Sequence, residues 1–280
     1  MKLAVFSDIH SNRIALETCV KFAEHLAVDE YIFLGDHIGI GYDPHGTLEI
    51  LRALSREKKT VILRGPAETA LIKRGAERSV PRKNGCQYER QVFTPSELTT
   101  EDFAFLRSLP ETALLTPMDS PAIYAEHLPG GQFVTIYPGT EAADILLRGA
   151  EHKVLLTGYS HIQFRYEAFG KQMINPGSVG LPSRGFRKAQ FSLLTCENGR
   201  VSTRMLNLDY DIAAALRELE RSNLSIGGGV YTKILARAYR TGENALDDVR
   251  RLVMQYSHLE DAAAAEERYW EMAAVELKLF

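Results

Sequence analysis

The sequence has few cysteines and no long hydrophobic run. Its three cysteines, Cys19, Cys86 and Cys196, are widely separated and odd in number, as expected in a reducing cytosol rather than in a disulfide scaffold. No stretch approaches the roughly 20 apolar residues of a membrane-spanning helix, and the apolar run at residues 3–6 is too short for a signal peptide. We therefore expect a cytoplasmic protein that does not enter a membrane.

An excess of one charge is also missing. The 280 residues include 33 Lys and Arg against 36 Asp and Glu, so the composition gives no reason to expect a nucleic-acid polymer or a membrane as partner. Internal repeats and low-complexity tracts are absent as well. A chain of this length can hold one large α/β domain with an accessory element.

The first quarter of the chain alternates short apolar runs with amphipathic segments. We predict strands at residues 2–6, 31–34 and 60–63, with helices at 12–27 and 47–56 between them. This alternation implies parallel strands joined by right-handed crossovers.

From residue 111 onward the pattern changes to short strands. We expect them at residues 112–115, 122–126, 133–136, 154–157, 164–169, 173–174, 190–195 and 201–206. A βαβ half followed by a β-rich half fits an α/β fold of two stacked mixed sheets flanked by helices. Residues 73–97, between the halves, are polar without periodicity and predict an insertion near the site, either a surface loop or a lid.

The last part of the chain is predicted to be helical. Asp211 is the expected cap of one helix and Gly242 the expected end of another. The apolar stripe that follows must be covered by the chain's own domain or by a second copy in a homodimer. We therefore divide the chain into a domain at 1–207 and a C-terminal helical extension at 208–280.

Acidic and imidazole side chains follow the first two predicted strands directly. Asp8 and His10 come after the first strand, and Asp36 comes after the second. The carboxyl ends of parallel strands meet in the crevice where open α/β sheets bind ligands. Because carboxylate and imidazole groups are metal ligands, this arrangement predicts a metal site.

The sequence from residue 1 to about residue 207 resembles the calcineurin-like metallophosphoesterases. The resemblance is carried by Ser7-Asp8-Ile9-His10-Ser11-Asn12, Gly35-Asp36-His37-Ile38-Gly39-Ile40-Gly41 and Asn175-Pro176-Gly177-Ser178-Val179-Gly180. The most similar members are small bacterial phosphodiesterases and phosphatases, including diadenosine-tetraphosphate hydrolases. The resemblance implies a four-layer αββα sandwich and a two-metal centre that clamps phosphate oxygens and activates water.

One set of metal ligands implied by the resemblance is complete. Asp8 and His10 match family ligands, Asp36 matches the bridging carboxylate, and His161 matches the last histidine of the closing motif. The mixture of carboxylate and imidazole suits manganese first, with iron and zinc as alternatives, at one or two ions per chain.

The other ligand set has changed. Pro66 and Ala67 stand where the family has asparagine and histidine, and Tyr159 stands where it has another histidine. Glu126 falls at the next ligand position, whereas a shift of one residue would place His127 there. Either residue would complete a second or altered metal site and the catalytic machinery.

Other residues are assigned supporting roles. Asn12 would hold the turn after the first ligand pair, and Asn175 and Ser178 belong to the loop that supports the ligands in this family. We expect Tyr159 to line the site and form hydrogen bonds rather than to bind a metal.

Other basic residues lie near the predicted site. Arg64 would supply positive charge near the changed ligand set. Arg184 and Arg187 either contact phosphate or are solvated. His37 is expected to face away from Asp36, because successive residues at a strand end point in opposite directions.

Two functions from different classes fit these observations. The first is a metal-dependent phosphoesterase that hydrolyses a small phosphomonoester or phosphodiester, with nucleotides among the candidates, by metal-activated water. The second is a catalytically impaired relative that acts as a metal- or phosphate-binding or protein-interaction module. The intact ligand set favours the enzyme, and Pro66 and Ala67 favour the module. We favour the hydrolase.

Overall fold

Two five-stranded sheets form the centre of the structure, a computed structural model that describes residues 1–76, 93–262 and 265–280. The first sheet consists of β1 (Lys2–Phe6), β2 (Glu30–Phe33), β3 (Thr60–Ile62), β9 (Ala189–Glu197) and β10 (Arg200–Leu208). The second consists of β4 (Thr112–Leu115), β5 (Ile123–Glu126), β6 (Val154–Leu156), β7 (Gln163–Ala168) and β8 (Lys171–Pro176). The strand orders are β10-β9-β1-β2-β3 and β4-β5-β6-β8-β7.

Both sheets are mixed. In the first sheet β1, β2 and β3 are parallel, as predicted, β9 pairs antiparallel with β1, and β10 pairs antiparallel with β9 at the edge. In the second sheet β5, β6 and β8 are parallel, with β4 and β7 antiparallel at the two edges. Each sheet therefore offers the carboxyl ends of three parallel strands to a ligand site.

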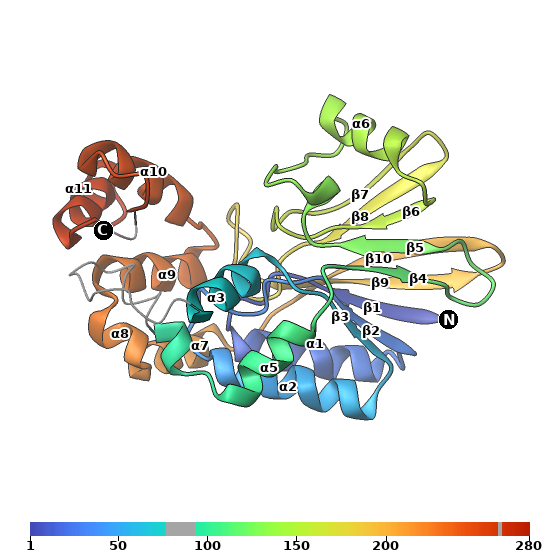
Figure 1. Cartoon of the computed structure of the whole chain (residues 1–280), viewed down its shortest axis with the longest axis horizontal. Helices are drawn as coiled ribbons and strands as arrows, with labels where there is room; N and C mark the ends of the chain where they lie inside the picture. Colours follow the sequence, from blue (N-terminus) through green and yellow to red (C-terminus); the bar gives the residue numbers. More distant parts are fainter. Residues whose placement is uncertain (77–92, 263–264) are drawn as a thin grey trace.

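The two sheets and the helices outside them form four layers (Figure 1). Apolar residues such as Val5, Ile123 and Leu156 fill the space between the sheets. The other face of the first sheet packs on helices, and the other face of the second sheet packs on one helix through residues such as Leu147. The helices before β9 are α1 (Arg13–His25), α2 (Pro44–Glu57), α3 (Pro66–Ala76), α5 (Thr100–Ser108) and α6 (Glu141–Gly149). The predicted αββα sandwich is confirmed.

The C-terminal extension is helical, as predicted. It contains α7 (Ile212–Arg221), α8 (Asn223–Gly227), α9 (Gly229–Thr241), α10 (Leu246–Ser257) and α11 (Glu267–Glu276). Asp211 caps α7, and Gly242 ends α9 in the left-handed conformation with φ 80°. Val249 and Trp270 are buried in the same apolar cluster as Leu16 of α1. The extension thus packs on its own chain, beyond the ends of β1 and β2 (Figure 1).

One predicted strand is wrong. Residues 133–136 form no strand, and they follow a short 3-10 turn, η1 (Pro129–Gly131). A strand needs a hydrogen-bonded neighbour, and among the described residues no strand pairs with this segment, where Val134 N donates locally to Gln132 O at 2.8 Å. Helix α6, which was not predicted, comes soon afterwards and is capped by Thr140.

The polar segment predicted as an insertion lies mostly outside the described residues, at 77–92. Residues 73–76 belong to α3. Among the described helices, none is both long and apolar enough to cross a bilayer.

The packing of the extension predicts that substitutions at two positions of α11 have very different effects on stability. Trp270 is fully buried and Met272 is 51% exposed. We expect Trp270→Ala to lower the free energy of unfolding by about 3–5 kcal/mol and Met272→Ala to change it by about 0.5 kcal/mol or less. Urea denaturation would measure both, and a neutral Trp270→Ala would contradict the packing of the extension on its own chain.

Candidate metal centre

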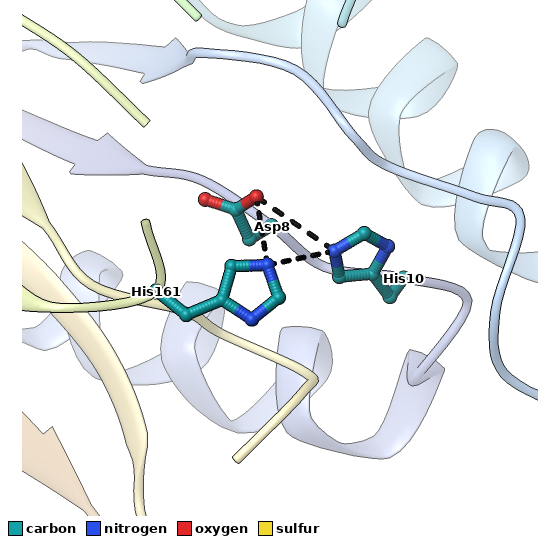
Figure 2. A group of neighbouring side chains, drawn as sticks. All are labelled: Asp8, His10 and His161. Carbon is teal, nitrogen blue, oxygen red and sulfur yellow. Dashed lines mark hydrogen bonds and ion pairs between the residues drawn. The ribbon is translucent and has the colours of Figure 1, made fainter. Parts of the chain in front are cut away.

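Five side chains from four loops meet at the carboxyl ends of the parallel strands. Asp8 and His10 follow β1, Asp36 follows β2, His127 follows β5 and His161 follows β6. Figure 2 shows three of them, Asp8, His10 and His161, pointing toward one another. Both sheets therefore contribute to one cluster.

The cluster contains two groups that could each hold a metal ion, and Asp8 belongs to both. In the first group, Asp8 Oδ1 lies 3.2 Å from His161 Nε2 and 3.7 Å from His10 Nε2, and the two Nε2 atoms are 3.1 Å apart. In the second group, His127 Nε2 lies 3.7 Å from Asp8 Oδ1 and 3.6 Å from Asp36 Oδ2. Asp8 belongs to both groups, and Asp36, which we expect to be the bridging carboxylate, belongs to the second.

These groups fit a metal ion in spacing and in chemistry. Ligand atoms at the usual 2.0–2.2 Å from a transition metal lie about 3–3.5 Å from one another, close to the separations in the first group. Among the described residues, Asp8 Oδ1 and both ring nitrogens of His127 are buried without a hydrogen bond. Leaving such an atom unsatisfied costs about 1–3 kcal/mol, so a bound cation would stabilise the arrangement.

Opposite charges shift the pKa values of the cluster. Burial alone would raise the pKa of Asp8, but the facing imidazoles of His161 and His127 hold that pKa well below its usual range. Burial alone would lower the pKa of His127, but the carboxylates of Asp36 and Asp8 raise it to about 9. Asp8 likewise raises the pKa of His161 against the effect of burial. The site therefore favours ionised carboxylates and attracts positive charge.

The backbone at the ligands is strained. Asp8, His10, Asp36 and His161 all have left-handed φ angles, of 55°, 49°, 52° and 56°. Such a conformation costs about 1–3 kcal/mol per residue and persists only where surrounding contacts enforce it. The loops supply these contacts, since Asp8 N donates to Gly35 O at 3.1 Å and His10 N donates to Asp36 O at 3.0 Å.

Glu68, which the sequence analysis did not assign to the site, fixes the loop that carries Asp36. Its carboxylate is fully buried and accepts four backbone N–H groups, those of Asp36, His37, Ile38 and Gly65, at 2.8–3.1 Å. Asp36 Oδ1 in turn accepts from Ala67 N at 2.9 Å. The signal available in the sequence was the acidic residue that ends Gly65-Pro66-Ala67-Glu68.

The residues assigned supporting roles hold the neighbouring loops. Asn12 caps α1 and donates to Gly180 O at 3.0 Å. Asn175 donates to Gly158 O at 2.7 Å, and Ser178 Oγ donates to the Asp8 carbonyl at 2.8 Å. These contacts connect the loops after β1, β6 and β8.

The structure brings His127, and not Glu126, into the cluster. Residues alternate between the two faces of a strand, so His127 continues the inner face of Ala125, which packs between the sheets. Glu126 points to the other face, where its carboxylate accepts from Gly130 N at 2.8 Å. The assignment of Glu126 as a ligand is therefore corrected. Alternation along β5 puts the two residues on opposite faces, and the packing of Ala125 decides that His127 faces the cluster.

Three other predicted positions differ in how they relate to the cluster. Tyr159 lies beside it and donates its backbone N–H to Asp8 Oδ2 at 3.2 Å. Burial and nearby carboxylates raise the pKa of its hydroxyl, which disfavours a tyrosinate ligand. Arg64 pairs with Glu111 at 2.7 Å instead of facing the cluster. His37 faces away from Asp36, as expected, with Nε2 2.8 Å from Leu63 O.

The cluster opens into a cavity of about 480 Å³. Pro66 and Ala67 line it without a ligating side-chain atom, and Arg184 lines it as well. Arg187 does not, because its guanidinium donates to Arg240 O at 3.3 Å. The cavity is large enough for a small organic ligand.

A family model and a relative each match most of the chain. The model of the calcineurin-like phosphoesterase superfamily domain matches residues 1–199. An uncharacterized protein of Methanocaldococcus jannaschii is 24% identical over 237 residues, which cover 79% of this chain and 93% of that protein.

Two solved structures share the fold. A hypothetical protein of Pyrococcus horikoshii has a TM-score of 0.70 at 20% identity, over 84% of this chain and 97% of that one. A metallophosphoesterase of Sphaerobacter thermophilus has a TM-score of 0.65 at 21% identity, over 79% of this chain and 93% of that one.

Metal binding is expected to release a proton from His127. In the metal-free protein a pKa of about 9 keeps this imidazole charged at pH 7.5, and a ligand must be neutral. Metal affinity should therefore rise with pH until about pH 9. At pH 7.5, calorimetry in buffers of different ionisation enthalpy should show that His127→Gln releases about one proton fewer per chain than the wild type. Equal release would show that His127 is not a ligand.

The role of Glu68 predicts a second effect on metal affinity. Glu68→Gln leaves one acceptor oxygen for four N–H donors, so the Asp36 loop should loosen and the affinity should fall about 10–100-fold. Glu111→Gln, at an exposed carboxylate, is the matched control and should leave the affinity unchanged. If both variants bind metal like the wild type, Glu68 does not position the ligands.

Proposed function

The chain belongs to the calcineurin-like phosphoesterase superfamily, and on this basis we propose that it is a metal-dependent hydrolase of a small phosphomonoester or phosphodiester, with nucleotides among its substrates. The observation that carries the proposal is the convergence of five carboxylate and imidazole side chains on one cluster, of which His10, Asp36 and His161 line the cavity. Manganese is the first candidate for the metal, with iron and zinc as alternatives.

The ligand assignment follows from the two groups. Asp8, His10 and His161 would hold one ion, and Asp8, Asp36 and His127 would hold the other. Bound divalent ions would lower the pKa of water and offset the charge of phosphate oxygens. Asp8 would contact both ions, because its carboxylate belongs to both groups.

Hydrogen bonds between the loops preorganise the candidate ligands. The strained ligand backbones are held by hydrogen bonds between loops, so little rearrangement is needed when a phosphate enters. Ala67 offers no side-chain proton donor beside the cavity. We therefore expect the best substrates to have leaving groups that are stable as anions, such as phenolates.

The alternative function is a metal- or phosphate-binding module without turnover. It is favoured by Pro66 and Ala67, which line the cavity but cannot ligate or protonate a substrate through their side chains. The two functions predict the same metal content but differ in hydrolysis, so one set of variants tests both.

Metal content and hydrolysis of bis-p-nitrophenyl phosphate test the proposal together. With two ions in the wild type, Asp8→Asn should lose both, because Asp8 serves both groups. His10→Gln and His127→Gln should each lose about one ion. All three variants should lose at least about 100-fold in activity.

His25→Gln is the matched control, because His25 is exposed and bonds only to the carbonyl of Lys21 among the contacts described. It should keep the wild-type metal content and activity. Metal binding that depends on Asp8 without any phosphoester hydrolysis would favour the binding module. Metal content that does not respond to Asp8→Asn would contradict both functions.

A further inference from the structure

The C-terminal extension forms part of the wall of the cavity at the metal centre. The family match ends at residue 199, before the extension begins. Even so, the cavity that exposes His10 and His161 is also lined by Asn244, Asp247 and Arg250. The part of the chain outside the family match therefore determines which ligands fit beside the metals.

The loop that carries Arg184 is fixed between the extension and a metal ligand. Gly185 N donates to Gly242 O at 2.9 Å, and a Cβ atom on Gly242 would lie 2.4 Å from Gly185 C. On its other side, Ser183 Oγ donates to the carbonyl of His161 at 3.1 Å. The position of this loop thus depends on the extension.

Two guanidinium groups line the cavity. Arg184 lies over the ring of Tyr137, 4.9 Å from its centroid, and its backbone has a left-handed φ of 53°. Arg250 of α10 pairs with Asp247 at 3.0 Å, and the Asp247 side chain is 89% exposed. An ion pair with so exposed a carboxylate is weak.

The size and charge of the cavity indicate what these arginines bind. A cavity of about 480 Å³ holds a whole small molecule rather than a single phosphate group. Guanidinium groups match phosphate in shape and charge. We propose that Arg184 and Arg250 bind a second phosphate of the substrate, which makes the extension the selector of phosphoesters with an additional phosphate. This inference rests on the proposed function for the position of the reacting phosphate.

A matched pair of chromogenic esters tests the selection. One is the p-nitrophenyl ester of thymidine 5′-phosphate, and the other is the same ester with a 3′-phosphate. The wild type should show a kcat/KM about tenfold or more higher for the 3′-phosphorylated ester. Arg184→Gln and Arg250→Gln should each reduce this preference, and the double variant should abolish it while retaining hydrolysis of the ester without the 3′-phosphate.

Two control variants remove a similar charge from the same elements outside the cavity. Arg251→Gln acts on the neighbouring residue of α10, which is 71% exposed and pairs with Asp248. Arg187→Gln acts on the Arg184 loop, where the side chain bonds to the carbonyl of Arg240. Both should keep the wild-type preference. If these controls lower the preference as much as Arg184→Gln and Arg250→Gln do, the preference reflects the overall positive charge of the protein, and the inference fails.

Calorimetric binding separates this inference from the proposed function. Thymidine 3′,5′-bisphosphate and thymidine 5′-phosphate are titrated into the manganese-loaded full chain. Tighter binding of the bisphosphate that disappears in the double variant supports the second phosphate site, even if neither ester is hydrolysed and the proposed function fails. Equal binding of the two nucleotides, or a preference that the double variant keeps, overturns the inference.

Discussion

The buried carboxylate of Asp8 is the interaction on which the site depends. Three imidazoles, those of His10, His127 and His161, face one of its oxygens within 3.7 Å. Because Asp8 is buried beside a second carboxylate, Asp36, the arrangement is stable only where positive charge balances the two acids. The imidazole of His127, whose pKa the carboxylates raise to about 9, does so in the metal-free chain, and metal ions would do so in the loaded protein.

The need to hold these charged ligands close together explains how the surrounding loops are built. Ligands in left-handed conformations need close backbone contact, and glycine permits it. A Cβ atom on Gly65 would lie 2.3 Å from Asp36 Oδ1, and one on Gly158 would lie 2.8 Å from His127 Nδ1. The buried carboxylate of Glu68 completes the support on the β2 side. The close backbone contacts at the glycines and the hydrogen bonds of Glu68 therefore hold the ligands in place.

Neither sheet could form the centre alone. The first sheet contributes Asp8, His10 and Asp36, and the second contributes His127 and His161. The apolar layer between the sheets sets their separation and so brings the two sets of ligands within reach of shared ions. The extension then adds a wall that depends on the packing of α9, α10 and α11 against the rest of the chain.

Local patterns in the sequence were sufficient for the parallel strands and the helical extension, because periodicity acts over a few residues. The resemblance to the family supplied Asp8, His10, Asp36 and His161 as candidate ligands. Tertiary structure alone decided three points. It chose His127 over Glu126, because only the inner face of β5 looks toward the first sheet. It left residues 133–136 without a partner strand. It also placed Arg250 beside the metal centre, since contacts between distant segments arise from packing and not from local sequence.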